Sequence, residues 1–289
     1  MENLEHLEIT LDSVTLHAVA AGPKDGPPLI LLHGFPDFWY GWRHQIEPLS
    51  KAGYRVLAPD MRGYNLSDKP SNRQDYGMEQ LGQDLVGLVR FTGHPKASVV
   101  GHDWGGGVLW WALDAHSEHI ERAVIINVPH TRVLQSALRS DMGQLRRSWY
   151  MLFFQLPRLP EMRLLGRRAQ NLLDSIGVHF ERSQDFEDPQ VREAYRDAWL
   201  QPGAMTAMLN YYRAALRNPP PRPTTSPQQV PTLLIWGQRD RALGPKLALA
   251  SQKRAPHIEL AQLDDCGHFP HVDDPQKVNA LMLDFLSRQ

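Results

Sequence analysis

The feature that most limits how this chain can fold is the stretch VVGHDWGGG at residues 99–107, where an apolar run meets a cluster of glycines. Residues 97–101 predict a short strand, and residues 104–116 predict a helix that begins almost at once. So short a connection needs a sharp turn, which the glycines permit because they tolerate strained backbone and close approach. The side chain at the corner of this turn is Asp103.

Strands and helices alternate on both sides of the turn. Short apolar runs predict strands that are buried on both faces, and amphipathic patterns predict helices between them. The expected strands lie at residues 28–32, 55–58 and 123–128, the expected helices at residues 39–51 and 78–92, and a strand pair precedes them at residues 6–11 and 14–20. Repeated β-α-β units of this kind predict an α/β fold, with a mostly parallel sheet and helices on both of its faces.

The alternation is interrupted once. From residue 131 to about residue 229 the pattern predicts helices and no buried strand, and this segment ends in the Pro-rich stretch RNPPPRPTTSPQQ. After that stretch the pattern resumes with strands at residues 232–236 and 258–260 and with helices from about residues 245 and 275. We therefore predict one α/β core built from residues 1–130 and 228–289, with a helical cap inserted at residues 131–227.

Composition excludes several classes of function. Among 289 residues, 42% are hydrophobic and 22% are charged, and the formal net charge is −1, so no global field attracts nucleic acid or anionic lipid. The first residues lack the features of a secretory signal, and no apolar run reaches the roughly 20 residues of a membrane anchor. A single cysteine, Cys266, fits a reducing compartment, so we expect a cytoplasmic protein.

One segment departs from this neutral balance. Residues 131–168 contain eight arginines but only two acidic residues, Asp141 and Glu161. A solvated helical face is the simpler interpretation, and an anionic partner or surface is the alternative.

An aspartate at the corner of a strand-turn-helix elbow suggests a particular chemistry. A carboxylate that attacks a saturated carbon bearing a leaving group forms an alkyl ester, which is a stable covalent intermediate. Water must then cleave that ester, and this step needs a general base and an oxyanion hole. The competing interpretation is that Asp103 is an ordinary helix N-cap.

The partners of such a nucleophile should follow in the order acid, then histidine. Asp240 comes four residues after the strand at residues 232–236, and His268 lies in a glycine-containing loop after the last strand. Asp264 and Asp265 fit turn or cap positions better. His271, three residues after His268, suggests a metal ligand, but we expect no metal because no cluster of ligands accompanies it in the sequence.

The oxyanion hole needs two backbone N–H groups. The residue after the nucleophile, Trp104, supplies one, and the loop after the first buried strand, HGFP, supplies the other through Phe35. The bond before Pro36 is a candidate cis peptide in this tight turn.

At this point the chain resembles the α/β-hydrolase-fold epoxide hydrolases over almost its whole length. The similarity is close in HGFPDFWYGWRHQIEPLSKAGYRVLAPDMRGY, in GHDWGG, in WGQRD and in DDCGHFPHVDDP. The resemblance implies an aspartate nucleophile and an Asp–His pair, which correspond to Asp103, Asp240 and His268. It also implies two cap tyrosines that hold the epoxide oxygen.

Two sequence matches locate these tyrosines. WYMLFFQLP gives Tyr150, and NYYR gives Tyr212, while the neighbouring Tyr211 is expected to pack. The resemblance implies a reaction without a cofactor or metal, in which water converts a small apolar epoxide to a vicinal diol. Phe35, Trp104, Tyr150 and Tyr212 are the expected substrate contacts.

Two alternatives stay open at this stage. A haloalkane dehalogenase has the same fold, elbow and ester intermediate, but it tends to have Asn in place of Phe35 and to lack the tyrosine pair. A hydrolase-fold ligand receptor with little turnover is an alternative of another class. An apolar pocket is expected from aromatic residues near the site: Phe35, Trp39, Trp104, Trp149, Phe153, Phe154 and Phe269. Monomer and homodimer are equally compatible with the sequence.

Overall fold

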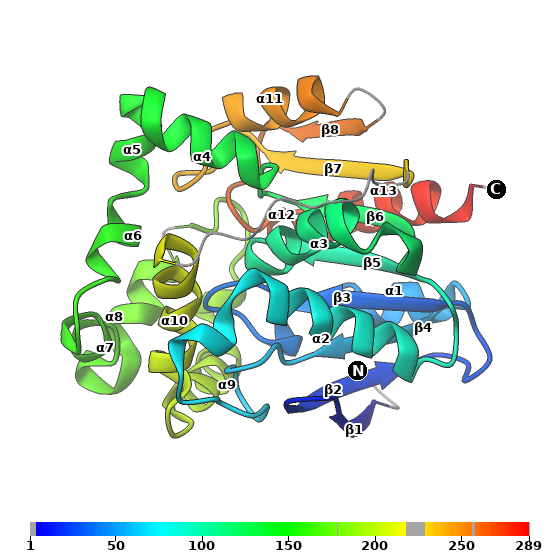
Figure 1. The fold of residues 1–289 in the computed structure, drawn as a ribbon, viewed down its shortest axis with the longest axis horizontal. Coiled ribbons are helices and arrows are strands. Elements are labelled where there is room, and N and C mark those ends of the chain that lie inside the picture. The colour runs from blue at the N-terminus through cyan, green and yellow to red at the C-terminus, as the bar shows by residue number, and fades with distance from the viewer. Residues whose placement is uncertain (1–3, 178, 218–228, 256–257, 289) are drawn as a thin grey trace.

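The computed structural model describes residues 4–177, 179–217, 229–255 and 258–288. Its centre is an eight-stranded sheet with the order β1-β2-β4-β3-β5-β6-β7-β8 (Figure 1). The strands are β1 (Glu5–Thr10), β2 (Thr15–Ala21), β3 (Pro28–Leu32), β4 (Arg55–Pro59), β5 (Ala97–His102), β6 (Ile120–Ile126), β7 (Thr232–Gly237) and β8 (Glu259–Leu263). The predicted α/β fold with a mostly parallel sheet is confirmed.

The direction of the strands follows their sequence patterns. β2 is antiparallel to both β1 and β4, and every other neighbouring pair is parallel. β3, β5 and β7 are buried along their whole length, as expected of central strands covered on both faces. The alternating segments at the N-terminus instead form the antiparallel edge, where one face of β1 is open to solvent.

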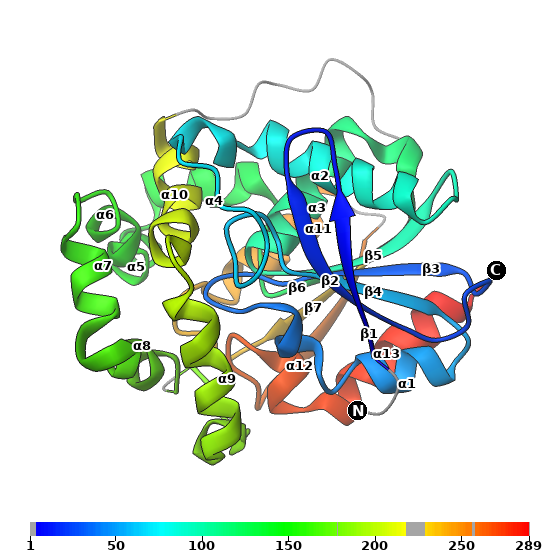
Figure 2. The same ribbon diagram turned by 90° about the horizontal axis from the view of Figure 1, so that it is seen from below.

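Helices cover both faces of the sheet (Figure 2). On one face lie α1 (Ile46–Lys51), α12 (Pro270–Asp273) and α13 (Pro275–Ser287). On the other face lie α2 (Met78–Phe91), α3 (Trp104–Ala115) and α11 (Lys246–Arg254). The sheet thus has one hydrophobic core on each side, and the strands contribute alternate side chains to the two cores.

The chain between β6 and β7 forms helices and no strand within its described residues. The helices are α4 (Thr131–Ser140), α5 (Met142–Arg147), α6 (Trp149–Phe153), α7 (Leu159–Leu164), α8 (Gly166–Gly177), α9 (Pro189–Leu200) and α10 (Ala204–Arg217). They gather at one end of the sheet (Figure 1). The predicted end of the cap and most of the Pro-rich stretch, residues 218–228, lie outside the described residues.

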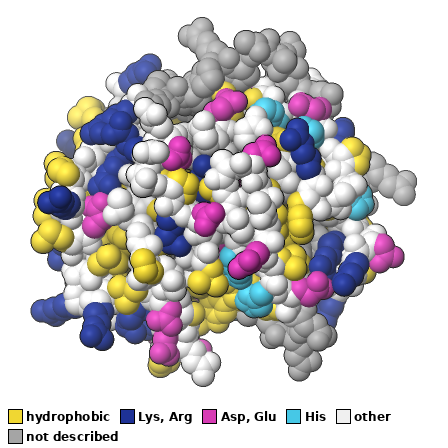
Figure 3. Space-filling view, turned by 60° about the horizontal axis from the view of Figure 1, so that its bottom comes forward, with side chains coloured by type: hydrophobic (Ala, Val, Ile, Leu, Met, Phe, Trp, Pro, Cys, Tyr) yellow, Lys and Arg dark blue, Asp and Glu magenta, His cyan; other side chains and the backbone are white. Residues whose placement is uncertain are grey.

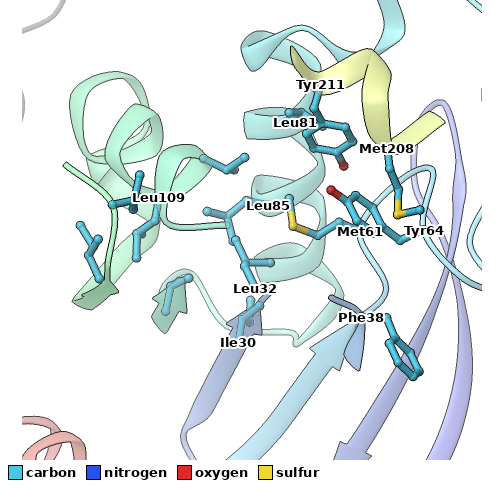
Figure 4. Close-up of a cluster of buried hydrophobic side chains, with 14 of the residues drawn as sticks. Ile30, Leu32, Phe38, Met61, Tyr64, Leu81, Leu85, Leu109, Met208 and Tyr211 are labelled. Carbon is cyan, nitrogen blue, oxygen red and sulfur yellow. The ribbon is translucent and has the colours of Figure 1, made fainter. Parts of the chain in front are cut away.

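Helix α10 shares the larger core with the sheet and α2. Met208 and Tyr211 point from α10 toward Tyr64 and Leu81 (Figure 4), and the Tyr211 hydroxyl donates to the Arg62 carbonyl at 2.8 Å. Tyr211 is fully buried there. It therefore packs, as expected, and this packing fixes the helix that also carries Tyr212.

Two elements differ most clearly from their predicted extents. Residues 39–51 are a 3-10 helix, Trp39–Trp42, a turn and then α1, because Pro48 cannot donate a hydrogen bond to the His44 carbonyl. The Asn279 side chain, from α13, donates to that carbonyl at 2.8 Å. β6 begins at Ile120 and ends at Ile126 because Asn127 turns into the left-handed region with φ 46°.

Other short elements were not expected from the pattern. They are α12 and the 3-10 helices Arg73–Tyr76, Ser117–His119 and Asp185–Glu187. Among the described residues, none of the helices has the length and apolarity required to span a bilayer.

Candidate active site

Asp103 stands on a strained corner between β5 and α3. Its backbone has φ 48° and ψ −117°, a conformation that few residues other than glycine adopt. The corner closes tightly, since a Cβ on Gly105 would lie 2.2 Å from the Leu32 carbonyl oxygen. The Asp103 side chain makes no capping hydrogen bond to α3, so the N-cap interpretation is wrong.

The carboxylate of Asp103 instead contacts two of the expected partners. Its Oδ1 accepts a hydrogen bond from the Phe35 backbone N–H at 2.8 Å, and its Oδ2 lies 3.5 Å from His268 Nε2. The other ring nitrogen, Nδ1 of His268, lies 2.7 Å from Oδ2 of Asp240. The bond between Phe35 and Pro36 is cis, as expected. The structure thus brings together residues from four separate parts of the chain.

The electrostatics of this group favour a charged pair. Burial disfavours the charged imidazolium of His268, but the negative charges of Asp240 and Asp103 outweigh that effect and raise its pKa to about 10. Burial likewise opposes ionisation of Asp240, yet the charge and hydrogen bond of His268 lower the Asp240 pKa. His268 is therefore protonated at neutral pH.

The two predicted tyrosines meet opposite this group. Tyr150 of α6 and Tyr212 of α10 have ring centroids 5.9 Å apart and lie nearly perpendicular to each other. The Tyr212 ring also packs edge-on against Trp104 at 5.0 Å and against Phe35 at 5.4 Å. Burial and the charge of Asp103 raise the pKa of both phenols above the ordinary value, so both stay protonated and can donate hydrogen bonds.

A cavity of about 370 Å³ joins the tyrosines to Asp103 and Trp104. Most of its wall is aliphatic, with contributions from Val128, Leu134, Leu138, Met151, Leu152 and Leu216. The predicted apolar pocket is present, but only Trp104 of the seven expected aromatic residues lines this cavity. Trp149 is 63% exposed on the outside of the cap, because α6 turns Tyr150 inward and Trp149 outward.

Asn127 is a residue of the site that sequence reasoning missed. Its amide nitrogen donates to Oδ2 of Asp240 at 2.8 Å, and its amide oxygen accepts from the Gly237 N–H at 2.8 Å. The side chain is fully buried and lies between the ends of β6 and β7. It therefore holds the acid in place. The only signal in the sequence was a polar residue within the apolar strand predicted at residues 123–128.

The cap is fastened to both catalytic loops. Gln144 of α5 donates to the Ala242 carbonyl and accepts from the Gly244 N–H, two and four residues after Asp240. On the other side, Asp273 accepts from the Gly267 N–H beside His268 and from backbone N–H groups of residues 181–183. No local sequence pattern predicts these contacts, because they join segments that are far apart in the sequence.

The expectation that no possible ligand cluster accompanies His271 is wrong. One ligand atom each from Asp37, His102 and His271 lies within 4.8 Å of the others, and all three side chains are buried. The cluster reaches the active site through His102, whose Nε2 lies 2.8 Å from the His268 carbonyl oxygen. Asp37 accepts hydrogen bonds from the Phe38 N–H and the Tyr195 hydroxyl. These contacts make the cluster a polar support beneath the catalytic loop.

The elbow, its position at the ends of parallel strands and the inserted helices define the α/β-hydrolase fold. The family described as alpha/beta hydrolase fold matches residues 27–275, and the chain belongs to it. Over its full length the chain is 42% identical to AB hydrolase superfamily protein YfhM of Bacillus subtilis (strain 168), and the match covers all of that protein.

Further similarity identifies the group within this fold. The chain is 36% identical to Epoxide hydrolase 3 of Xenopus tropicalis, over 94% of this chain and 75% of that protein. A crystal structure of Bacillus megaterium epoxide hydrolase with an inhibitor superposes with a TM-score of 0.85 at 28% identity, covering 98% of this chain and 100% of that one. The chain therefore belongs to the α/β-hydrolase-fold epoxide hydrolases.

Proposed function

We propose that this protein hydrolyses epoxides to vicinal diols through a covalent ester on Asp103. The observation that carries the proposal is the arrangement of Asp103, which faces His268 on one side and shares an apolar cavity with Tyr150 and Tyr212 on the other. Two relatives named as epoxide hydrolases support the same reaction.

In the first step, the Asp103 carboxylate attacks one oxirane carbon and breaks its bond to oxygen. The released alkoxide takes a proton from one of the two tyrosines while the other donates a hydrogen bond. Conversion of Asp103 to a neutral ester removes the charge that raises the pKa of both phenols. The site therefore stabilises the resulting tyrosinate more strongly after the attack than before it.

In the second step, water cleaves the ester. Loss of the Asp103 charge also lowers the pKa of His268, so the imidazole can give up its proton, and the neutral ring then takes one from water. The hydroxide attacks the carboxyl carbon of Asp103, and the N–H groups of Phe35 and Trp104 stabilise the oxyanion. Collapse releases the alkoxide of the diol, which takes the proton from His268. The regenerated Asp103 carboxyl group then passes its proton to His268, and the tyrosinate recovers from solvent the proton that His268 first gave up.

The decisive experiment traps the intermediate. His268→Gln removes the base but leaves the nucleophile, so we expect the intact mass to rise by one epoxide molecule and the adduct to map to Asp103. An unmodified protein or an adduct elsewhere would contradict the mechanism.

A turnover panel compares styrene-type, aliphatic and fatty-acid epoxides with haloalkanes. Halide release faster than diol formation would instead identify a dehalogenase, and binding without turnover would identify a receptor.

Labelled water tests the origin of the new oxygen. In a single turnover with enzyme in excess, the diol should receive its new oxygen from Asp103 and remain unlabelled, while the label enters the Asp103 carboxylate. A labelled first-turnover diol would mean that water attacks the epoxide directly and that Asp103 acts as a base.

A further inference from the structure

The outer edge of the cap exposes many large apolar side chains. Of the twelve large hydrophobic residues that are exposed in the described part of the chain, seven fall between residues 142 and 162. They are Met142, Leu145, Trp149, Leu152, Leu156, Leu159 and Met162. Helices α5, α6 and α7, which carry most of them, follow one another along the same edge in Figures 1 and 2. Clustering of this kind marks an interaction site.

The same edge is strongly positive. All eight arginines of residues 131–168 are exposed, and none forms an ion pair with another described residue. The rest of the chain has 23 basic and 30 acidic residues, so its charge is opposite to that of this segment. Figure 3 shows basic and apolar side chains side by side along this edge. We call the seven apolar residues and these arginines the cap patch.

The catalytic cavity reaches this surface at two residues of the cap patch. Leu145 and Leu152 belong to the cap patch, are exposed, and also line the cavity that contains Asp103. Leu216 of α10, 59% exposed, lies on the same wall. A molecule that entered from the direction of the cap patch would therefore pass from an apolar surface directly into an apolar cavity.

We propose that the cap patch docks the protein onto an anionic lipid bilayer surface. Exposed Trp, Leu and Met side chains enter the boundary between headgroups and acyl chains, and arginines interspersed among them bind lipid phosphates. The distribution of charge also orients the molecule, because an anionic surface attracts the arginines of the cap patch and repels the rest of the chain, where acidic residues outnumber basic ones. Two copies meeting through the patch would bring their arginine clusters together, which disfavours a dimer at this face.

Docking has a consequence for the reaction, and this step rests on the proposed function. An apolar epoxide dissolved in the bilayer reaches Asp103 without crossing water, because exposed side chains of the docked patch also line the cavity. Binding to lipid itself does not depend on the reaction. Vesicle binding by Asp103→Asn thus separates a failure of the docking proposal from a failure of the proposed function.

The test is sedimentation with vesicles of phosphatidylcholine alone or mixed with phosphatidylglycerol. We expect binding to the mixed vesicles only, and its loss at high salt. Arg146→Gln with Arg163→Gln should weaken binding roughly thirty-fold, given the typical contribution of each basic residue near an anionic surface. Trp149→Gln with Met162→Gln should weaken it to a similar extent. None of these four residues lines the catalytic cavity, so turnover of a water-dissolved epoxide should be unchanged.

Matched variants elsewhere on the surface provide the control. Arg90→Gln with Arg254→Gln, and Phe91→Gln with Leu249→Gln, remove side chains that are also exposed but lie outside the cap patch, and these variants should leave vesicle binding intact. Equal losses in patch and control variants, or no binding to the mixed vesicles at low salt, would overturn the proposal. So would a dimer that the patch variants dissociate, or an acidic protein that competes with the vesicles for the same residues.

Discussion

At the scale of single residues, one negative charge controls two different groups. Asp103 raises the pKa of His268, and it also raises the pKa of Tyr150 and Tyr212. Ester formation removes this charge, so the raised pKa values of His268 and of the two tyrosines both fall. This happens when His268 must become a base and the tyrosines must donate a proton or a hydrogen bond. The nucleophile thereby sets the protonation of its partners in each half of the reaction.

Asp103→Asn provides a direct test of this coupling, because the amide resembles the uncharged ester. The imidazolium of His268 loses one of two nearby negative charges, so its pKa should fall from about 10 by at least about one unit. Asp240 remains, so the pKa should stay above the value in Asp103→Asn/Asp240→Asn. NMR titration of ring-labelled histidine measures both variants. An unchanged pKa in Asp103→Asn would show that the two groups are not coupled.

The tyrosines offer a second test. General-acid assistance typically contributes about 10²–10⁴-fold, so Tyr150→Phe and Tyr212→Phe should each slow formation of the Asp103 ester. Because two donors are partly redundant, the double variant is the decisive sample and should be nearly inactive. Tyr211→Phe is the matched control, since that hydroxyl faces the Arg62 carbonyl and not the cavity. Full epoxide turnover by a folded double variant would exclude the tyrosines from the reaction.

At the scale of elements, most strands could be predicted from short stretches of sequence, because burial of the strand itself requires apolar side chains. β3 spans Pro28–Leu32, as predicted, because a strand with two buried faces has no polar position. The helix at residues 39–51 was wrong because Pro48 cannot donate to the His44 carbonyl, which instead accepts from Asn279, 235 positions away. Periodicity cannot detect a backbone carbonyl whose partner comes from another helix.

The same reasoning explains which site residues were found. Asp103, Asp240 and His268 each stand in a local motif, so their positions could be proposed from short stretches. Asn127 and Gln144 have no motif, and their importance lies in contacts with Asp240 and its loop. Such supports become visible only when the strand ends are placed beside one another.

Asn127 is therefore a good target at this scale. Asn127→Ala leaves the Gly237 N–H without its acceptor and Asp240 with one donor fewer, and we expect a loss of about 1–3 kcal/mol in the free energy of unfolding. Ester hydrolysis should slow, since Asp240 is held less firmly. Urea unfolding and single-turnover kinetics measure the two effects.

A glycine at the same position separates two causes. Asn127 has a left-handed backbone, which alanine adopts with strain and glycine adopts freely. If the amide matters, Asn127→Gly should be impaired like Asn127→Ala. Recovery of wild-type stability and activity by Asn127→Gly would assign the whole effect to backbone strain.

At the scale of the whole molecule, the site lies between two units that the sequence presents as separate. The core supplies Asp103, Asp240 and His268, and the cap supplies Tyr150 and Tyr212. Their order along the chain could be predicted, but the shape of the space between them could not. That shape depends on how α4, α6 and α10 pack over the sheet edge, and no single segment encodes it.

The aliphatic wall of this space leads to a prediction about substrate size. Along a series of 1,2-epoxyalkanes, each added CH₂ that enters the cavity should raise kcat/KM by up to about four-fold, the value expected for full burial of a methylene. The increase should stop once the cavity of about 370 Å³ is filled. Leu134→Trp occupies part of that volume, so kcat/KM should stop rising at a shorter alkyl chain. Leu249→Trp, on the exposed side of α11, is the control and should leave that chain length unchanged. Measurement in vesicle-free buffer keeps the cavity effect apart from lipid docking. A kcat/KM independent of chain length, or an equal shift in both variants, would mean that the alkyl chain binds elsewhere.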